Sequence, residues 1–185
     1  MSRRRHPADD PERRKWQDPY VILSSIGVRE GDVFVDVGCG EGYFALPAAR
    51  RIGKKGQVYA IDINEEAVAQ LRRQADDEGL SQLQAFTARA EEAVLCDGCA
   101  DIVFFGNDLH DFSDPGQVIM NARTMLKTSG RVVDLDWKAE PMDIGPPVER
   151  RFSVERVKHM IQSARLQILS VQEAGPYHYM IIAAR

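Results

Sequence analysis

The chain has 185 residues, of which 44% are hydrophobic and 28% are charged, and its formal net charge is −4. This composition fits one globular domain with its own core, and the acidic balance argues against a general nucleic-acid binder. No apolar run reaches the length of a membrane span and no signal-peptide pattern follows the first arginines, so we expect a cytoplasmic protein without a membrane partner. The three cysteines, an odd number, also fit a reduced compartment.

Two Asp-Pro pairs near the N-terminus predict two short helices, because aspartate caps a helix and proline fits its first turn. The first helix is expected over residues 12–17, and the second over residues 20–26, where Gly27 ends it. Arginines at positions 3, 4 and 5 precede both helices. We expect residues 1–17 to form an N-terminal arm and residues 18–185 to form a single domain.

The middle of the chain alternates between patterns typical of strands and patterns typical of helices. Short apolar runs rich in β-branched residues predict strands at residues 32–37, 57–62, 84–88, 101–105 and 131–135. Amphipathic runs with capping signals predict helices at residues 44–52, 65–78, 117–126 and 154–165. This alternation indicates βαβ units around a mostly parallel sheet, and therefore an α/β fold.

The C-terminal part departs from this alternation. Strands are expected at residues 168–172 and 177–183, with a turn at Gly175-Pro176 between them. A connection this short cannot cross over a sheet, so the two strands must be antiparallel. The proline-rich segment 137–151 predicts a long loop at the carboxyl edge of the sheet, where α/β proteins bind their ligands.

The most informative segment joins the first predicted strand of the sheet to the helix that follows it. Glycines at positions 38, 40 and 42 give the spacing G-x-G-x-G, and Asp36 precedes them. Glycine lets the chain turn sharply and lets a ligand approach bare backbone at a helix N-terminus, as in nucleotide sites. The spacing differs from the dinucleotide fingerprint G-x-G-x-x-G, and the Lys-Ser/Thr pair of a P-loop is missing. Asp62 ends the next predicted strand, where its carboxylate can accept both hydroxyls of a ribose.

With Asp36, the glycine loop and Asp62, the chain resembles the class I S-adenosylmethionine-dependent methyltransferases. It is most similar to their small type 11 branch, which includes ubiquinone and menaquinone C-methyltransferases. The resemblance spans roughly residues 16–185, and the matching segments are residues 35–44, 58–63, 88–92, 101–112 and 125–136. It implies a three-layer Rossmann-like fold whose seven-stranded sheet is mostly parallel, with an antiparallel C-terminal hairpin and the strand order 3-2-1-4-5-7-6. It also implies methyl transfer from S-adenosylmethionine to an acceptor, expected to be a small molecule, with S-adenosylhomocysteine as the product.

The resemblance assigns the cofactor contacts residue by residue. The positions expected to bind the cofactor are Asp36, Gly38, Cys39, Gly40, Gly42, Asp62, Ile63, Ala90, Glu91 and Asn107. Arg89 departs from the family pattern, because it stands where an aspartate usually accepts a hydrogen bond from the adenine amine. Arginine has only donors, so either Glu91 or backbone carbonyls must supply that acceptor.

The acceptor is expected on the far side of the cofactor, along the same edge of the sheet. His110 follows the fourth predicted strand and is the histidine best placed for acid–base catalysis, with a hydrogen-bonded structural role as the alternative. The residues expected to contact the acceptor are Trp16, Tyr20, Asp111, Asp136, Trp137 and Tyr177. The arm has no strand before it, so it can close over this edge as a lid. Deleting residues 1–17 is then expected to weaken acceptor binding more than cofactor binding.

We expect no metal. Cys96 and Cys99 form a single C-x-x-C pair, whereas structural zinc needs four ligands, so we interpret the pair as a tight loop rather than a metal or redox site. Metal-dependent catechol-type methyltransferases carry an Asp-Asn pair after the fifth strand, and Asp136-Trp137 stands there in this chain.

Two other functions stay open at this point. The arginine-bearing arm would suit a methyltransferase of RNA or protein, which would hold its substrate partly through charge. Arg89 would suit a module that binds S-adenosylmethionine without transferring its methyl group. The sequence does not specify the acceptor or the oligomeric state.

Overall fold

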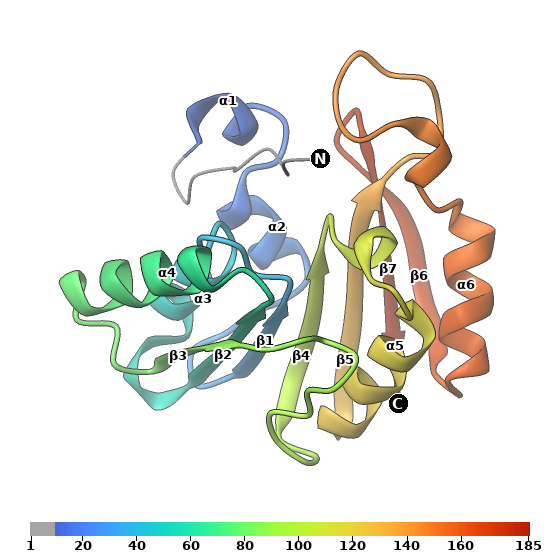
Figure 1. Cartoon of the computed structure of the whole chain (residues 1–185). Coiled ribbons are helices and arrows are strands. Elements are labelled where there is room, and N and C mark those ends of the chain that lie inside the picture. Colours follow the sequence, from blue (N-terminus) through green and yellow to red (C-terminus); the bar gives the residue numbers. More distant parts are fainter. Residues whose placement is uncertain (1–9) are drawn as a thin grey trace.

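A computed structural model describes residues 10–185, so the arginines at positions 3–5 and the rest of the first nine residues lie outside the described residues. Seven strands form one sheet in the order β3-β2-β1-β4-β5-β7-β6 (Figure 1). The strands are β1 (Val33–Val37), β2 (Gln57–Asp62), β3 (Leu83–Thr87), β4 (Ala100–Gly106), β5 (Leu126–Trp137), β6 (Gln167–Ala174) and β7 (His178–Ala184). Pairing is parallel from β3 through β5, and β7 runs antiparallel to both β5 and β6. The predicted fold class and strand order are confirmed.

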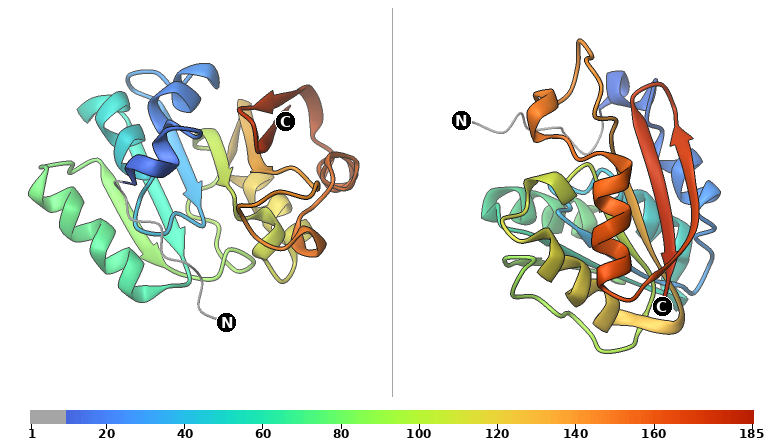
Figure 2. Two further views of the ribbon diagram at one scale, coloured as in Figure 1. Left: turned by 90° about the horizontal axis from the view of Figure 1, so that it is seen from above. Right: turned by 90° about the vertical axis from the view of Figure 1, so that its right-hand side faces the viewer.

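Helices cover both faces of the sheet and make three layers (Figure 2). The helices are α1 (Pro11–Arg14), α2 (Pro19–Ser25), α3 (Ala45–Ile52), α4 (Glu65–Asp77), α5 (Pro115–Met125) and α6 (Val154–Ser163). Three short 3-10 turns are η1 (Gly53–Lys55), η2 (Leu109–Asp111) and η3 (Val148–Arg150). Apolar side chains of α2, α3 and α4 pack in one buried cluster with one face of the sheet, and those of α5 and α6 pack in a second cluster with the other face.

Most of these helices begin at a capping residue that can be recognised in the sequence. The side chain of Asp18 accepts from the amides of Tyr20 and Val21 at the start of α2, and Asn64 caps α4 in the same way. Each such bond satisfies an amide that has no partner within its helix. Asn64 follows β2 by two residues, so its cap helps to fix where the chain leaves that strand at the carboxyl edge of the sheet.

Three differences from the sequence predictions are larger than a shift of one or two residues at the end of an element. Helix α1 ends at Arg14 rather than at residue 17, because Asp18 must be extended to precede Pro19 and cap α2. Strand β5 begins at Leu126, directly after α5, and it is longer than the five residues predicted. The third difference is the pair Cys96–Cys99, which the structure joins in a disulfide rather than leaving as free thiols in a loop.

The carboxyl ends of the parallel strands lie along one edge of the sheet, beneath two segments that are distant in sequence. Figure 1 shows α1 and the loop between β5 and α6 above this edge, on either side of the ends of β1, β4 and β5. Within residues 10–185, no helix combines the length and the apolar character that a membrane crossing needs.

Candidate cofactor and acceptor site

A cavity opens at the carboxyl ends of β1, β2 and β4. Its walls are formed by Gly38, Ile61, Asp62, Ile63, Ala88, Arg89, Ala90, Glu91, Asp108, Asp111, Phe112 and Ser113. Six of the residues that the sequence assigned to the site are among them: Gly38, Asp62, Ile63, Ala90, Glu91 and Asp111. The cavity lies where ligands bind in open α/β sheets, beside the strand at which the sheet order reverses.

Asp62 links the glycine loop to the second strand. Its Oδ2 accepts from the Gly40 amide at 2.9 Å, and its Oδ1 accepts from the Asn64 amide at 2.8 Å. The amides of Gly38 and Cys39 both donate to the Ile61 carbonyl, which holds the loop against β2. Each carboxylate oxygen can accept more than one bond, so Asp62 can order the loop and still receive hydroxyl groups from a ligand in the cavity.

The glycines of the loop have different surroundings. A Cβ atom at Gly40 would meet no atom within 4 Å, so this position leaves space for a ligand beside bare backbone. A Cβ atom at Gly42, where φ is +95°, would lie 2.4 Å from Leu71 Cδ1, so this glycine lets α4 pack against the loop. Cys39 is buried, and burial raises the pKa of its thiol well above the usual range, which keeps it protonated.

Asp36 lies beneath the loop as a buried acid with an unused oxygen. Its side chain is 2% exposed, and its Oδ2 has no hydrogen-bond partner among the described residues. Burial and the charge of Asp62 raise the pKa of Asp36 to about 7, although Arg13 and the Ala45 amide oppose the shift. A buried carboxylate oxygen without a partner is costly, so Oδ2 suits a cationic or hydrogen-bond-donating ligand.

The opposite wall of the cavity has the features expected for an adenine site, except that Arg89 stands where the family pattern has an aspartate. Ile63 is 57% exposed and offers an apolar surface, while Ala90 is buried. Glu91 is held by the Ser113 amide, which donates to its Oε1 at 2.9 Å. Its other oxygen lies 3.7 Å from Arg89 Nη2, so the arginine that departs from the family pattern sits beside the carboxylate proposed to replace the missing acceptor.

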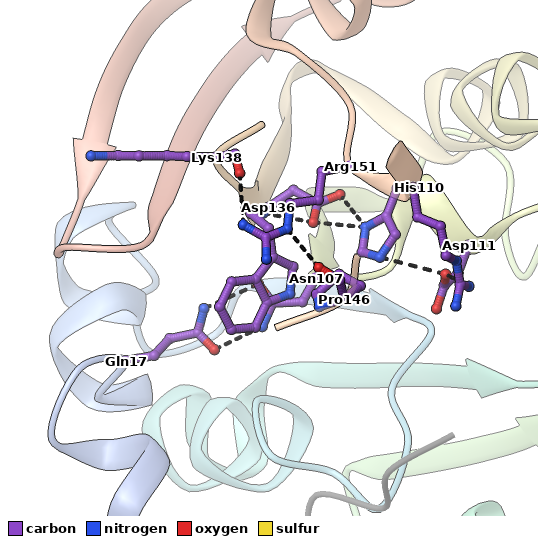
Figure 3. A network of polar contacts seen from close by, with 10 residues as sticks. Gln17, Asn107, His110, Asp111, Asp136, Lys138, Pro146 and Arg151 are labelled. Atoms are coloured by element: carbon purple, nitrogen blue, oxygen red, sulfur yellow. Dashed lines mark hydrogen bonds and ion pairs between the residues drawn. The ribbon is translucent and has the colours of Figure 1, made fainter. Parts of the chain in front are cut away.

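Asn107 ends the fourth strand in a left-handed conformation, with φ at 71°. Its amide pairs with the amide of Gln17 through two hydrogen bonds of 3.1 and 2.9 Å (Figure 3). Gln17 also accepts from the Tyr43 hydroxyl through its backbone carbonyl at 2.6 Å. These bonds tie the N-terminal segment to the glycine loop and to the end of β4.

His110 lies between two carboxylates. Its Nδ1 is 2.8 Å from Asp136 Oδ1, and its Nε2 is 3.4 Å from Asp111 Oδ1 (Figure 3). Asp111 also forms an ion pair with Arg150 of η3. Burial lowers the pKa of His110, but the hydrogen bond to Asp136 and the charges of Asp136 and Asp111 outweigh it, so the net shift is upward. Asp111 lines the cavity and His110 does not, so the imidazole reaches the site through Asp111.

Aromatic rings gather where the residues after α1 meet the ends of β5 and β7, and none of these rings is among the residues that line the cavity. Trp16 lies 5.6 Å from Trp137, 5.8 Å from Tyr177 and 5.4 Å from His178, measured between ring centroids. Three of the predicted acceptor residues therefore meet. Tyr20 is apart from them, because its hydroxyl accepts from Arg50 of α3, and its contact with an acceptor stays a prediction.

Three buried polar residues of this region were not predicted: Arg13, Gln17 and Arg151. Arg151 donates to the carbonyls of Lys138, Glu140, Ile144 and Pro146, and so it holds the loop after β5 in one shape. No local motif marks such residues, because arginine and glutamine are usually exposed. The one sequence signal for Arg151 was its position at the end of the proline-rich segment 137–151.

The chain matches a family described as "Methyltransferase domain" over residues 29–166. A solved S-adenosylmethionine-dependent methyltransferase from Aquifex aeolicus is 30% identical, with a TM-score of 0.89 over 95% of this chain and 93% of that one. The demethylmenaquinone methyltransferase of Bacillus subtilis is 28% identical over 71% of this chain and 55% of its own length. A ubiquinone/menaquinone biosynthesis C-methyltransferase of Shewanella piezotolerans is 26% identical over 93% of this chain and 66% of its own length. The chain therefore spans about half to two thirds of these two curated relatives.

Proposed function

Because the chain belongs to the type 11 branch of the class I S-adenosylmethionine-dependent methyltransferases, we propose that it transfers a methyl group from S-adenosylmethionine to a small-molecule acceptor. The observation that carries the proposal is the pair of acids at the glycine loop. Asp62 orders the loop and faces the cavity, while the buried Asp36 keeps an unpartnered oxygen. This arrangement fits a ligand with ribose hydroxyls at one point and a cationic group at another.

The residues of the cavity divide the binding of such a ligand among them. Asp62 would accept the ribose hydroxyls, and the open backbone at Gly40 would lie alongside the sugar. Ile63 would cover one face of the adenine, and Ala90 and Glu91 would meet its edge. When bound, S-adenosylmethionine supplies an activated methyl group, so the chemistry itself belongs to the cofactor.

What remains for the chain is to hold the acceptor in line and to exclude water. Trp16 and Trp137 would form an apolar wall for the acceptor, closed by the N-terminal segment and by the loop that Arg151 holds. Asp111, held by His110 and Arg150, is one polar group of the cavity wall, and it would orient an acceptor hydroxyl or receive its proton. His110 is then a positioning residue that acts through Asp111.

The acceptor class follows from this wall and from the relatives. Tryptophan and tyrosine side chains suit a flat, apolar molecule. The relatives named above are a demethylmenaquinone methyltransferase and a ubiquinone/menaquinone biosynthesis C-methyltransferase, which supports an aromatic acceptor of quinol type. A nucleic-acid acceptor gains no support from a chain of net charge −4.

The test is a transfer assay with S-adenosylmethionine labelled on its methyl group. We expect label to appear in an extractable product with hydroquinones or phenols, and not in RNA or protein. The Asp62→Ala variant serves as the control for the cofactor site. Label in RNA or protein alone would contradict the small-molecule proposal. Binding of S-adenosylhomocysteine without transfer to any of these acceptors would favour a module that binds without catalysis.

A further inference from the structure

One wall of the cavity belongs to a segment that is neither helix nor strand. Residues 88–99 join the end of β3 to the start of β4, two parallel strands that have β2 and β1 between them in the sheet (Figure 1). Such crossovers usually contain a helix, which holds its own shape through its backbone hydrogen bonds. This one crosses the sheet as irregular chain, and its first part, from Ala88 to Glu91, lines the cavity. The shape of that wall therefore depends on the contacts that hold the crossover in place.

At the cavity end, a buried side chain of α5 holds the crossover. Asn121 is 8% exposed, and its Nδ2 donates to the carbonyls of Ala90 and Glu91, each at 2.9 Å. Ala93 follows shortly after them and is buried in the apolar cluster on this face of the sheet. These contacts fix the backbone where Ala90 and Glu91 would meet the adenine.

The far end of the crossover is tied to the same helix by two backbone amides. The Leu95 amide donates to Met125 Sδ at 3.4 Å, and the Gly98 amide donates to the Thr124 carbonyl at 3.0 Å. Gly98 has φ at +60°, a conformation that suits glycine. Leu95 and Gly98 lie on either side of Cys96, so the turn between them must keep its shape for both amides to reach α5.

A disulfide between Cys96 and Cys99 closes that turn, and their Cα atoms are 5.9 Å apart. The bond encloses only four residues, so it constrains the unfolded chain little and adds little to global stability. Its local effect is larger, because it holds the turn that presents Gly98 to α5. Both cysteines are half-buried against the apolar cluster, while Asp97 and Gly98 between them are exposed, so a small reductant can reach the bond.

The surroundings of the pair favour a switch over a catalytic dithiol. Oxidoreductases stabilise a reactive thiolate at a helix N-terminus or beside a cation. Cys96 and Cys99 lie outside every helix of residues 10–185, and the charged residue between them is the acid Asp97. In reducing compartments, disulfides that are not catalytic are usually redox-sensing.

We propose that Cys96 and Cys99 form a reversible redox site that controls the adenine wall of the cavity. The inference rests on the proposed function and differs from the plain loop expected from the sequence. A dithiol supplies the electrons: its thiolate attacks one sulfur of the disulfide to form a mixed disulfide, and its second thiolate then displaces the remaining sulfur of the chain. The chain gains two electrons and two protons as the thiols of Cys96 and Cys99, and the dithiol leaves as its own disulfide.

Reduction releases the turn but leaves Asn121 in place, so the expected result is a loosened wall in a folded protein. A base that binds against this wall must then order the crossover again, which weakens binding. Every ligand that carries the adenine should lose affinity by the same factor, because the change lies at the base end of the cavity. We expect the reduced chain to bind both S-adenosylhomocysteine and methylthioadenosine about three- to tenfold more weakly than the oxidised chain does.

Calorimetry with these two ligands tests the inference on the full chain, first oxidised and then reduced with dithiothreitol in the absence of denaturant. Mass spectrometry after alkylation counts the thiols, and reduction should add those of Cys96 and Cys99 to that of the buried Cys39. Amide hydrogen exchange gives a second measurement. The Leu95 and Gly98 amides should exchange faster after reduction, whereas the amide of Val103, in the centre of the sheet, should not change.

The double variant Cys96→Ser/Cys99→Ser is the control that cannot form the disulfide. It should bind both ligands as the reduced wild type does and should not respond to dithiothreitol. The comparison of the two wild-type forms stands whether or not this variant folds.

Three results would overturn the inference and leave the proposed function standing. They are equal affinities of the oxidised and reduced wild type, a disulfide that forms or breaks only in denaturant, and a double variant that still responds to dithiothreitol. Failure of both wild-type forms to bind S-adenosylhomocysteine would overturn the proposed function as well.

Discussion

The first prediction concerns the buried acid Asp36, whose ionisation should lower the stability of the fold while it favours cofactor binding. Its folded-state pKa of about 7 lies well above the value of about 3.9 for an exposed aspartate. A folded state that holds its proton more tightly than the unfolded state loses stability as pH rises, here from about pH 4 until Asp36 is ionised above about pH 7. Between pH 5 and pH 8 the free energy of unfolding falls mainly over the two pH units below the pKa of Asp36. The expected loss is roughly 2–3 kcal/mol.

Asp36→Asn removes this titration and keeps the size of the side chain. Urea unfolding at pH 5 and pH 8 gives the free energy of unfolding of both proteins. We expect the variant to gain roughly 2–3 kcal/mol relative to wild type between pH 5 and pH 8, whatever constant packing cost the amide carries. Other titrating groups are common to both proteins and cancel. Asp77→Asn, at the exposed end of α4, is the matched control and should show no such gain.

The same variant should bind S-adenosylhomocysteine more weakly, because a neutral amide replaces a buried carboxylate that suits a cationic or hydrogen-bond-donating ligand. The reasoning is refuted if the stability difference between variant and wild type is the same at pH 5 and pH 8. It is equally refuted if the variant gains stability with pH but binds S-adenosylhomocysteine as tightly as wild type does.

Asp62→Ala should weaken S-adenosylhomocysteine binding about ten- to a hundredfold, which is the scale of hydrogen bonds to a charged group. It should also lower the free energy of unfolding, because the Gly40 amide loses its acceptor. An unchanged dissociation constant in a folded variant would count against the ribose assignment. Gly42→Ala should cost about 2 kcal/mol or more in urea unfolding, since its Cβ would lie 2.4 Å from a leucine methyl group, and wild-type stability would contradict this packing role. Asp136→Asn should lower the pKa of His110, measured by NMR titration of the imidazole, and no change would contradict the assigned hydrogen bond. Trp16→Ala should raise the KM for the acceptor and leave S-adenosylhomocysteine affinity unchanged, and wild-type kinetics would remove Trp16 from the acceptor wall.

Local patterns predicted the elements of the fold well, because strands and helices differ in hydrophobic period and most of the helices begin at a capping side chain. The end of β2 and the start of α4 follow from Asp62 and Asn64 at those positions. The order of the strands came from the resemblance, since spacing alone does not say which strands pair. Strand β5 was predicted too short because its first residues pair only where Leu126 meets Ala100, a contact that the local sequence does not encode.

The sequence singled out the candidate site residues whose type is dictated by backbone conformation, and it did not single out those whose burial depends on contacts between distant segments. The glycine loop and Asp62 carry their signal in the local sequence. Arg13 shows none, because its burial depends on Tyr43 and Gln17 meeting it in three dimensions. For Tyr20, the sequence suggested a place in the acceptor wall through its aromatic character, but it did not show that the Tyr20 hydroxyl accepts a hydrogen bond from Arg50.

The central claim is that the cavity beside Asp62 takes S-adenosylmethionine rather than a dinucleotide. Calorimetric titration of the full chain with S-adenosylhomocysteine and, separately, with NAD tests it most directly. We predict saturable binding of one S-adenosylhomocysteine per chain and no saturable heat with NAD. Tight binding of NAD with no response to S-adenosylhomocysteine would contradict the account.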